Sequence, residues 1–377
     1  MHGFTGQYYL EYENGRSFYT FYPRALSDLQ LNAFDEETIS LLITAHRQIG
    51  ILEGRIRSIA DIETYCTLLM YYEAVHSCQM AGIDISMFDA WDAYSKKTAG
   101  LSSIQSYTNA VKYGFSHIHS TRTPLKLFCQ LYRILTGCQE ASDIGLLRKE
   151  QIFTEPLISV VGLRTYNPPN PDNLKESYRD FENYWNATCK YDVLIQAALI
   201  YYQFCTIQPF IKDNERITRI LTNLFLIKRE VISHPLLCLS YFFNHDRIDC
   251  LDRLNHVRRD ISDSYEPWIK YFIKAIAIAA ERTNEVLAAL EKTRCEDSFR
   301  LCAIENLSKH IFAVYERLWN NPIIEARQMA KMLDISYNTA AKAITTLTDF
   351  NILEQIGEQS RYRRFLYRKL FDILCGA

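Results

Sequence analysis

The sequence predicts a mainly α-helical fold, and three observations carry this prediction. With 377 residues and 48% hydrophobic content, the chain is long enough for two domains with substantial cores. Its 13 glycines and 10 prolines are few, which favours long uninterrupted helices over a sheet of many strands. From residue 35 onward, apolar residues recur at spacings of three and four, the pattern of a helix with one buried face.

The first stretch of the chain has a different character. Residues 8–23 alternate aromatic and polar side chains around Asn14 and Gly15, which predicts a short β-hairpin or an extended arm packed on the body. Amphipathic helices are then expected at residues 38–49, 59–80, 107–113, 124–135, 174–185, 192–205 and 268–281. A long linking helix with charged faces is expected over 282–310.

The period changes between residues 151 and 169. Phe153, Ile158 and Val160 stand among β-branched neighbours, and a polar, proline-containing stretch at 166–169 closes the segment. This pattern predicts a second β-hairpin.

Residues 207–219 predict a loop that meets a buried helix N-terminus. Asp213 stands where an N-cap would stand, and one buried helical face follows it, formed by Ile217, Ile220, Leu221, Leu224 and Phe225. Such a terminus carries unpaired N–H groups and partial positive charge, so it often holds a phosphate. Arg216 and Arg219 are placed to close over one.

The C-terminal residues 311–377 predict a winged helix. A helix at 326–333, a tight turn, a helix at 338–350 and strands at 352–356 and 361–367 follow one another. Its expected core is Met329, Ala330, Leu333, Ile335, Ala340, Ile344 and Leu347. Basic residues that are candidates for DNA contact lie on the second helix and the wing, namely Lys342, Arg361, Arg363 and Arg364. Acidic neighbours dilute this patch, so a packing or dimerisation role remains open beside DNA binding.

The stretch from 208 to 219 resembles the motif HPFx(D/E)GNGRxxR of the Fic family. The matching residues are Pro209, Phe210, Asn214, Arg216 and Arg219. The resemblance implies the Fic fold, a helical bundle whose members mostly transfer AMP from ATP to a protein hydroxyl. It also implies that the motif His acts as the base and the acidic residue holds magnesium. In this chain Gln208 stands at the His position, Lys212 at the acidic position, and Asp213 and Glu215 at the two Gly positions.

Other segments extend the resemblance. Residues 73–82 are similar to a stretch whose last Glu inhibits one Fic subgroup by binding the second motif Arg, with Ser77 and Gly82 kept and Ala81 at the Glu position. The same residues also read as a helix end with a Gly C-cap, and both interpretations can hold together. The 151–169 hairpin corresponds to the family's flap, which aligns an extended protein target, although a plain structural hairpin remains open.

The residues at the motif positions limit the chemistry. An amide has no useful pKa, so Gln208 cannot supply general-base assistance, and an ammonium such as Lys212 cannot replace an oxygen ligand of magnesium. Asp213 and Glu215 are expected to satisfy the first N–H groups of the helix themselves. Glu215 is also expected to pair with Arg219 as a built-in anion, with Arg219 reaching another carboxylate or solvent as the alternative.

The resemblance divides the chain into four parts. These are an N-terminal Fic-associated helical segment at 1–100, a Fic domain at 101–281, the linking helix at 282–310 and the winged helix at 311–377. Two functions stay open: a catalytically impaired regulator, and an active transferase with a non-standard base, for which Asp213 is the nearby candidate. Expected partners are a protein target at the flap, DNA at the tail, and a second copy of the chain; ATP with magnesium is implied only by resemblance.

Composition bounds the environment. The net charge of −2 excludes attraction of the whole chain to nucleic acid or anionic lipid. Eleven cysteines stand singly in apolar surroundings without zinc spacing, which predicts buried free thiols, no metal site and a reducing cytoplasm. No apolar run approaches the ~20 residues that span a bilayer, so neither membrane insertion nor secretion is expected.

Overall fold

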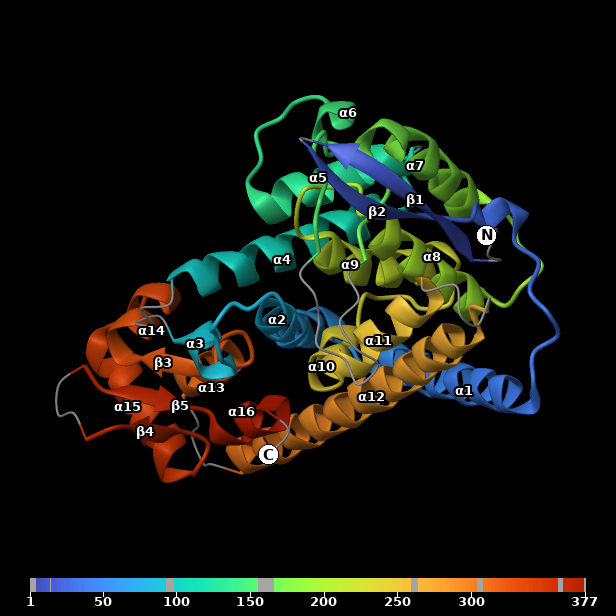
Figure 1. The fold of residues 1–377 in the computed structure, drawn as a ribbon. Coiled ribbons are helices and arrows are strands. Elements are labelled where there is room, and N and C mark those ends of the chain that lie inside the picture. Colours follow the sequence, from blue (N-terminus) through green and yellow to red (C-terminus); the bar gives the residue numbers. More distant parts are fainter. Residues whose placement is uncertain are drawn as a thin grey trace.

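The computed structural model describes residues 5–13, 15–92, 98–121, 123–154, 166–258, 264–303, 308–358 and 362–375. Helices dominate these residues, and two small sheets lie at opposite ends of the molecule (Figure 1). The long helix α12 (Glu266–Cys302) runs from the helical body to the C-terminal segment (Figure 1). No helix in the described ranges is both long and apolar enough to cross a membrane.

The N-terminal hairpin is confirmed. Strands β1 (Gly6–Glu13) and β2 (Arg16–Pro23) pair antiparallel, from Gly6 opposite Pro23 to Glu13 opposite Arg16. The hairpin is fastened at its base, because Phe21 is fully buried and donates its N–H to the Asn167 C=O at 2.9 Å. A 3-10 turn (Leu26–Asp28) then leads into the helices.

The helical body begins with α1 (Glu36–Ser58), which Asp35 caps by accepting from the Thr38 N–H. The following helices are α2 (Ile62–Met80), α3 (Met87–Trp91), α4 (Thr98–His117), α5 (Pro124–Thr136), α6 (Asp143–Leu146), α7 (Pro171–Asn186), α8 (Val193–Ile207), α9 (Asn214–Lys228), α10 (Leu239–His245) and α11 (Arg247–Arg258). Every helix predicted before residue 282 is present, although α2 starts at Ile62 because Ile59 still ends α1.

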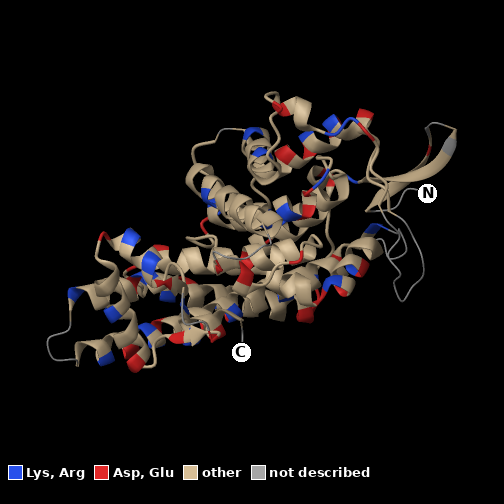
Figure 2. Ribbon diagram, turned by 90° about the vertical axis from the view of Figure 1, so that its left-hand side faces the viewer, with Lys and Arg blue, Asp and Glu red and all other residues tan. Residues whose placement is uncertain are grey.

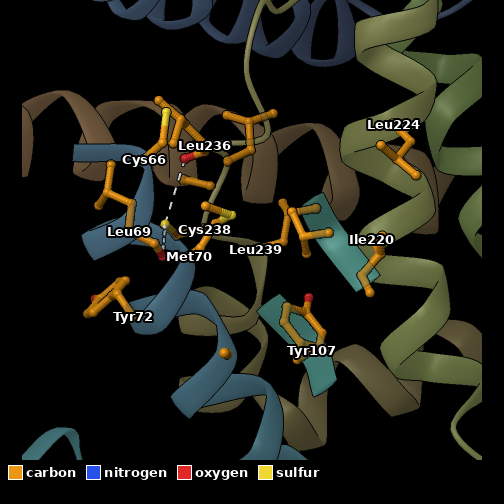
Figure 3. Close-up of a cluster of buried hydrophobic side chains, with 14 of the residues drawn as sticks. Cys66, Leu69, Met70, Tyr72, Tyr107, Ile220, Leu224, Leu236, Cys238 and Leu239 are labelled. Carbon is orange, nitrogen blue, oxygen red and sulfur yellow. Dashed lines mark hydrogen bonds between the residues drawn. The ribbon is translucent and has the colours of Figure 1, made fainter. Parts of the chain in front are cut away.

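The helices α8 and α9 form the centre of the body. Nearly all their residues are buried, because α7 and α12 pack against α8, and α4 and α5 pack against α9. Figure 3 shows part of this core, a cluster of buried side chains in which Leu239 and Tyr107 of α4 lie between Leu69 of α2 and Leu224 of α9. This packing holds the N-terminus of α9 at a fixed place beside α2 and α4.

The prediction of a linking helix at 282–310, separate from the helix at 268–281, is wrong. The boundary at 281/282 lies inside α12, which continues without interruption to Cys302, and a separate helix α13 (Lys309–Leu318) follows. Charged residues beyond 282 led to the linker prediction, but Val286, Leu287 and Leu290 continue the buried face of α12. The division of the chain into four parts stays a prediction.

The C-terminal segment contains the predicted helices and strands. Helices α14 (Ala326–Leu333) and α15 (Tyr337–Asp349) precede strands β4 (Glu354–Ile356) and β5 (Arg364–Leu366), and α16 (Arg368–Cys375) ends the described chain. A short strand β3 (Ile323–Glu325), which the sequence did not predict, pairs with β5 and completes the sheet order β3-β5-β4. Met329, Ala340, Ile344 and Leu347 are buried, and Ala330, Leu333 and Ile335 are partly buried. The assignment as a winged helix stays a prediction.

Candidate functional site

The loop between α8 and α9 is closed by one side chain. Asn214 accepts a hydrogen bond from the Phe210 N–H at 3.0 Å and donates one to the Phe210 C=O at 2.7 Å. The Phe210 ring is fully buried and stacks on Tyr132, with 4.4 Å between ring centroids. Gln208 lies just before this closed loop with a left-handed φ of 41°. These contacts fix the backbone from which the Gln208 side chain projects.

Arg148 holds the same loop from the other side. Its Nε donates to the Gln208 C=O at 2.8 Å, and its other nitrogens donate to the carbonyls of Pro169 and Glu150. Burial lowers the pKa of Arg148 to about 10, and the guanidinium stays charged at neutral pH. The sequence alone assigned no role to Arg148, because a residue that binds backbone carbonyls leaves no pattern of its own. The predicted 151–169 hairpin lies mainly outside the described residues, which leave out 155–165.

Asp213 stands at the N-cap position of α9, but its side chain does not cap the helix. Its backbone is left-handed, with φ of 59°, and the carboxylate makes no hydrogen bond to the first N–H groups of α9. Instead it pairs with Arg216 at 3.1 Å. The expected self-capping by Asp213 is therefore wrong, because the turn directs its carboxylate to Arg216.

Arg216 connects α9 to α4. Its Nη2 donates to the Ser103 C=O at 3.2 Å, and its guanidinium lies 5.6 Å from the centroid of the Tyr107 ring. With Asp213 on its Nη1, most of its donors are used within the protein. Arg216 therefore mainly connects α9 to α4, whereas the sequence predicted that it closes over a phosphate.

Arg219 is buried and only partly satisfied. It is 1% exposed, and Nη2 donates to the Ser77 Oγ of α2 at 2.9 Å. Among the residues that the structure describes, its Nε and Nη1 have no hydrogen-bond partner. Burial lowers the pKa of Arg219, but the neighbouring Tyr201 and Tyr107, followed by Glu215 and Glu73, more than offset burial and keep the pKa above its ordinary value. Two unsatisfied N–H-bearing atoms on a permanent cation are suited to an anion.

The predicted ion pair between Glu215 and Arg219 is wrong. No hydrogen bond or ion pair joins these two residues, and Glu215 is exposed in the first turn of α9. Arg219 instead lies near the buried Glu73, which sequence reasoning had not placed in the site. Glu73 accepts from Tyr107 Oη at 3.1 Å and from the Ser240 N–H at 2.9 Å, and burial raises its pKa to about 7, against the opposing effects of Ser240 and Arg219.

A pocket of about 370 Å³ opens at the N-terminus of α9. It brings together the motif positions: its lining includes Gln208, Lys212, Asp213, Asn214, Glu215, Arg216 and Arg219. Arg247 of α11 adds a further cation, to which the sequence alone assigned no role. A second pocket of about 350 Å³ adjoins the first, and Gln208, Glu215 and Arg247 border both. The cations outnumber the carboxylates in the first pocket, so it attracts anions.

The end of α2 forms another wall of the first pocket. Gly82 has a φ of 77°, its N–H binds the Gln79 C=O, and the Ile83 N–H binds the Cys78 C=O. The glycine C-cap interpretation is thus confirmed. Ala81 precedes this turn and borders the pocket, so α2 presents a methyl group where the resembling subgroup has its inhibitory Glu. Ser77, one turn earlier, is the hydroxyl that contacts Arg219.

The residues present do not fit a magnesium ion of the kind that the resemblance implies. The motif position for its carboxylate holds Lys212, whose side chain is exposed, and Asp213 is engaged by Arg216. Across the described ranges, no group of three or more His, Cys, Asp or Glu residues could hold a metal. A phosphate group fits better, because Arg219 offers two unsatisfied nitrogens.

The candidates for DNA contact lie away from this pocket, and they differ in whether their side chains are exposed or paired. Lys342 is exposed on α15, and Arg363 is exposed beside β5. Arg364 pairs with Asp92 at 2.7 Å and is therefore committed to holding the C-terminal segment against the end of α3. Its prediction as a DNA contact is contradicted by this pairing, whereas Arg361 lies outside the described residues.

Comparisons with known proteins agree with the fold and the motif. Residues 122–226 match the model of the Fic/DOC family, and residues 39–116 match that of the Fic/DOC family N-terminal segment. A Fic family protein from Desulfovibrio desulfuricans is similar over 90% of this chain and 98% of that chain, with a TM-score of 0.52 and 12% identity. Fic-1 from C. elegans is similar over 65% of this chain and 70% of that chain, with a TM-score of 0.49 and 15% identity.

A Fic domain containing signaling protein from Bacteroides thetaiotaomicron is similar over 64% of this chain and 97% of that chain, with a TM-score of 0.48 and 12% identity. At 12% identity, the likeness to the Desulfovibrio desulfuricans protein concerns the fold. The two matched segments follow one another along the chain, and the second contains the motif residues 208–219 that border the pocket. The chain belongs to the Fic/DOC family.

Proposed function

We propose that this protein is a catalytically impaired regulator of the Fic type, which binds a phosphate-bearing ligand of the nucleotide class at the N-terminus of α9. One observation carries the proposal. Arg219 is 1% exposed, lines the pocket and keeps two guanidinium nitrogens unsatisfied, while Gln208 stands on the same pocket at the position of the family's base. The site is thus suited to bind an anion but not to remove a proton.

The Glu215 carboxylate does not fill the site at Arg219. Because Glu215 leaves Arg219 unpaired, an incoming phosphate can take that place and satisfy Nε and Nη1. Arg247 and Lys212 lie on the pocket walls and would add charge attraction from the solvent side. Magnesium is not part of the proposal, because the donor set does not suit it.

Binding is tested by calorimetric titration with ATP, ADP and inorganic phosphate, with and without magnesium. We expect ATP to bind without a magnesium requirement and Arg247→Ala to weaken it. Arg253→Ala on the same helix is the matched control, because Arg253 pairs with Asp249 and does not line the pocket. Equal affinity for both variants, or binding that requires magnesium, would contradict the proposed site.

Impaired catalysis is tested by incubation with labelled ATP and a cell lysate. We expect no transfer by the wild-type chain, and none by Gln208→His, because Lys212 still occupies the metal-ligand position. Restored labelling in that single variant would show that the base is the only missing part and would overturn the proposal.

The second candidate function is an active transferase with a non-standard base. Glu215 is a better candidate for that base than Asp213. Glu215 borders both pockets beside Gln208 and has no hydrogen-bond partner within the described part of the chain, whereas the Asp213 carboxylate is paired with Arg216. If the wild-type chain does transfer a labelled group, Glu215→Gln should abolish transfer and Asp213→Asn should reduce it less. Loss of activity in Asp213→Asn alone would exclude Glu215 as the base.

For the C-terminal segment we propose a winged helix that contacts DNA. Supporting this, a groove of about 450 Å³ between α14, α15 and β5 has Arg327 and Arg363 on its lining and a single carboxylate, Glu325. Lys342 lies exposed on α15. The combined change of Lys342 and Arg363 to Ala should weaken DNA binding and lower its salt dependence. Lys175→Ala on the distant helix α7 is the control, and unchanged binding in the double variant would move the contact elsewhere.

We also propose a reducing compartment, the cytoplasm, for this protein. All eleven cysteines are free thiols, and six of them are buried. Free buried thiols persist where disulfide formation is not favoured. A purified chain with an intramolecular disulfide would contradict this placement.

A further inference from the structure

The two adjoining pockets at the N-terminus of α9 differ in charge. The first pocket, of about 370 Å³, has more cations than carboxylates among its charged side chains, which are Lys212, Asp213, Glu215, Arg216, Arg219 and Arg247. Elsewhere in the molecule, basic and acidic residues are interspersed along the helices (Figure 2). The attraction of an anion therefore depends on the local charges of the first pocket and not on the field of the whole chain.

The second pocket, of about 350 Å³, has apolar walls. Leu251 and Leu254 of α11 and Cys205 of α8 line it, and Leu254 and Cys205 are buried. Burial raises the pKa of the Cys205 thiol to about 12, so this group carries no charge at neutral pH. These walls suit an uncharged group with apolar faces.

The charged residues of the second pocket do not favour an anion there. Arg258 is a buried cation on this pocket, but its three donor nitrogens bind acceptors of α8 and α11 at 3.0–3.1 Å. Arg247 and Glu215 are exposed and opposite in sign. A ligand that fills both pockets therefore places its charged end at Arg219 in the first pocket and its neutral end in the second.

The middle of such a ligand meets the residues that border both pockets. These are Gln208, Glu215 and Arg247. The Glu215 carboxylate can only accept hydrogen bonds, and it has no hydrogen-bond partner within the described ranges. A phosphate at this place would meet like charge, whereas a group with hydrogen-bond donors would be stabilised. The part of the ligand between its charged and neutral ends must therefore donate.

We propose that Glu215 accepts hydrogen bonds from the sugar hydroxyls of a ribonucleotide and so determines the sugar specificity of this site. The inference rests on the proposed phosphate site at Arg219. In a nucleotide the sugar lies between the phosphates and the base, so phosphates at Arg219 and a base beside Leu251 and Leu254 bring the sugar to Glu215. A carboxylate suits this role, because two neighbouring hydroxyls can both donate to its oxygens.

The proposal is tested by calorimetric titration of the full chain with three kinds of ligand. These are ATP and GTP, the 2′,3′-dideoxy forms of both nucleotides, and tripolyphosphate, which has neither sugar nor base. We expect the wild-type chain to bind one ribonucleotide at least about 10-fold more tightly than its dideoxy form, the usual effect of a lost hydrogen bond to a charged group.

Glu215→Ala should remove most of this difference, because the acceptor is lost. The same variant should bind tripolyphosphate at least as tightly as the wild type, since a carboxylate no longer repels the anion. Opposite effects on the two ligands separate a sugar contact from a general disturbance of the site. Glu176→Ala is the matched control and should keep the wild-type difference, because Glu176 is exposed on α7 and lies outside both pockets.

The outcomes distinguish this inference from the proposed function. If the wild-type chain bound neither nucleotide nor tripolyphosphate, both would be overturned. Binding of tripolyphosphate together with equal affinity for the ribonucleotides and their dideoxy forms would overturn the sugar contact and leave the phosphate site standing. A difference that survives unchanged in Glu215→Ala would also overturn the role of Glu215, because the sugar would then be held by another residue.

Discussion

The motif residues of this chain divide into two groups by what their side chains contact. Those that match the family, Phe210, Asn214, Arg216 and Arg219, are buried and bind the loop, α4 or α2. Those that depart from it, Gln208, Lys212, Asp213 and Glu215, line the pocket and are partly or fully exposed. The fold therefore depends on the first group, and the change in chemistry is confined to the second.

Glu73 predicts a measurable pH dependence of stability. Its pKa is raised to about 7 by burial, so between pH 4.5 and 7 the unfolded chain loses this proton while the folded chain keeps it. The stability from Glu73 is present below pH 4.5 and is lost as pH rises to about 7. Relative to Glu73→Gln, the wild-type chain should lose on the order of 3 kcal/mol over this range.

The measurement is denaturant unfolding of both proteins at several pH values, with the difference between their unfolding free energies plotted against pH. Glu63→Gln, on the exposed side of the same helix, is the control for removing one carboxylate. A difference that stays level would mean that Glu73 is ionised throughout, as the direct partner of Arg219.

At the scale of the elements, the approach of α4 to α9 depends on a glycine. A Cβ at Gly114 of α4 would lie 2.5 Å from Leu224 Cδ1, and Leu224 is fully buried in the core (Figure 3). Gly50 of α1 is the opposite case, because a Cβ there would meet nothing within 4 Å. Both glycines lie inside long helices, so they form a matched pair.

We predict that Gly50→Ala stabilises the protein by about 0.5–1 kcal/mol, the usual gain of Ala over Gly in a helix. Gly114→Ala should be less stable than Gly50→Ala by about 1–3 kcal/mol, because overpacking offsets the helix gain. Thermal unfolding of the two variants beside the wild type measures both effects. If the two variants were equally stabilised, α4 and α9 would have room that the described packing does not show.

At the scale of the whole molecule, the C-terminal segment is fastened to the body at several places. Tyr367 donates to Asp297, a carboxylate of α12 that is 0% exposed. Arg364 pairs with Asp92 after α3, and Arg294 of α12 joins Asp61 to Glu316 of α13. These contacts predict that the segment and the body unfold together.

Tyr367→Phe tests this coupling. Removing the hydroxyl leaves the buried Asp297 carboxylate without its hydrogen bond, which should cost about 1–3 kcal/mol. We expect one calorimetric transition that moves to lower temperature as a unit. Tyr337→Phe on exposed α15 is the control and should leave the transition unchanged. An early separate transition in Tyr367→Phe would show that the C-terminal segment melts independently of the body.

Much of this fold and the position of the site could be predicted from the sequence. Helix periodicity is local, so the buried faces of α1, α8 and α9 are visible in the spacing of their apolar residues. The hairpin follows from alternation around Asn14 and Gly15, and the site follows from the motif before α9. The sequence also shows that Gln208 cannot act as a general base, because this follows from its amide group alone.

Only the tertiary structure decided which groups meet. The Asp213 carboxylate pairs with Arg216 because the backbone of Asp213 is left-handed. Glu215 and Arg219 stand four residues apart but form no ion pair, and Arg219 instead donates a hydrogen bond to Ser77 of α2. The roles of Arg148, Glu73 and Arg364 depend on partners dozens to hundreds of residues away. Sequence spacing determines which residues share a face of one helix, whereas contacts between distant segments depend on how the whole chain packs.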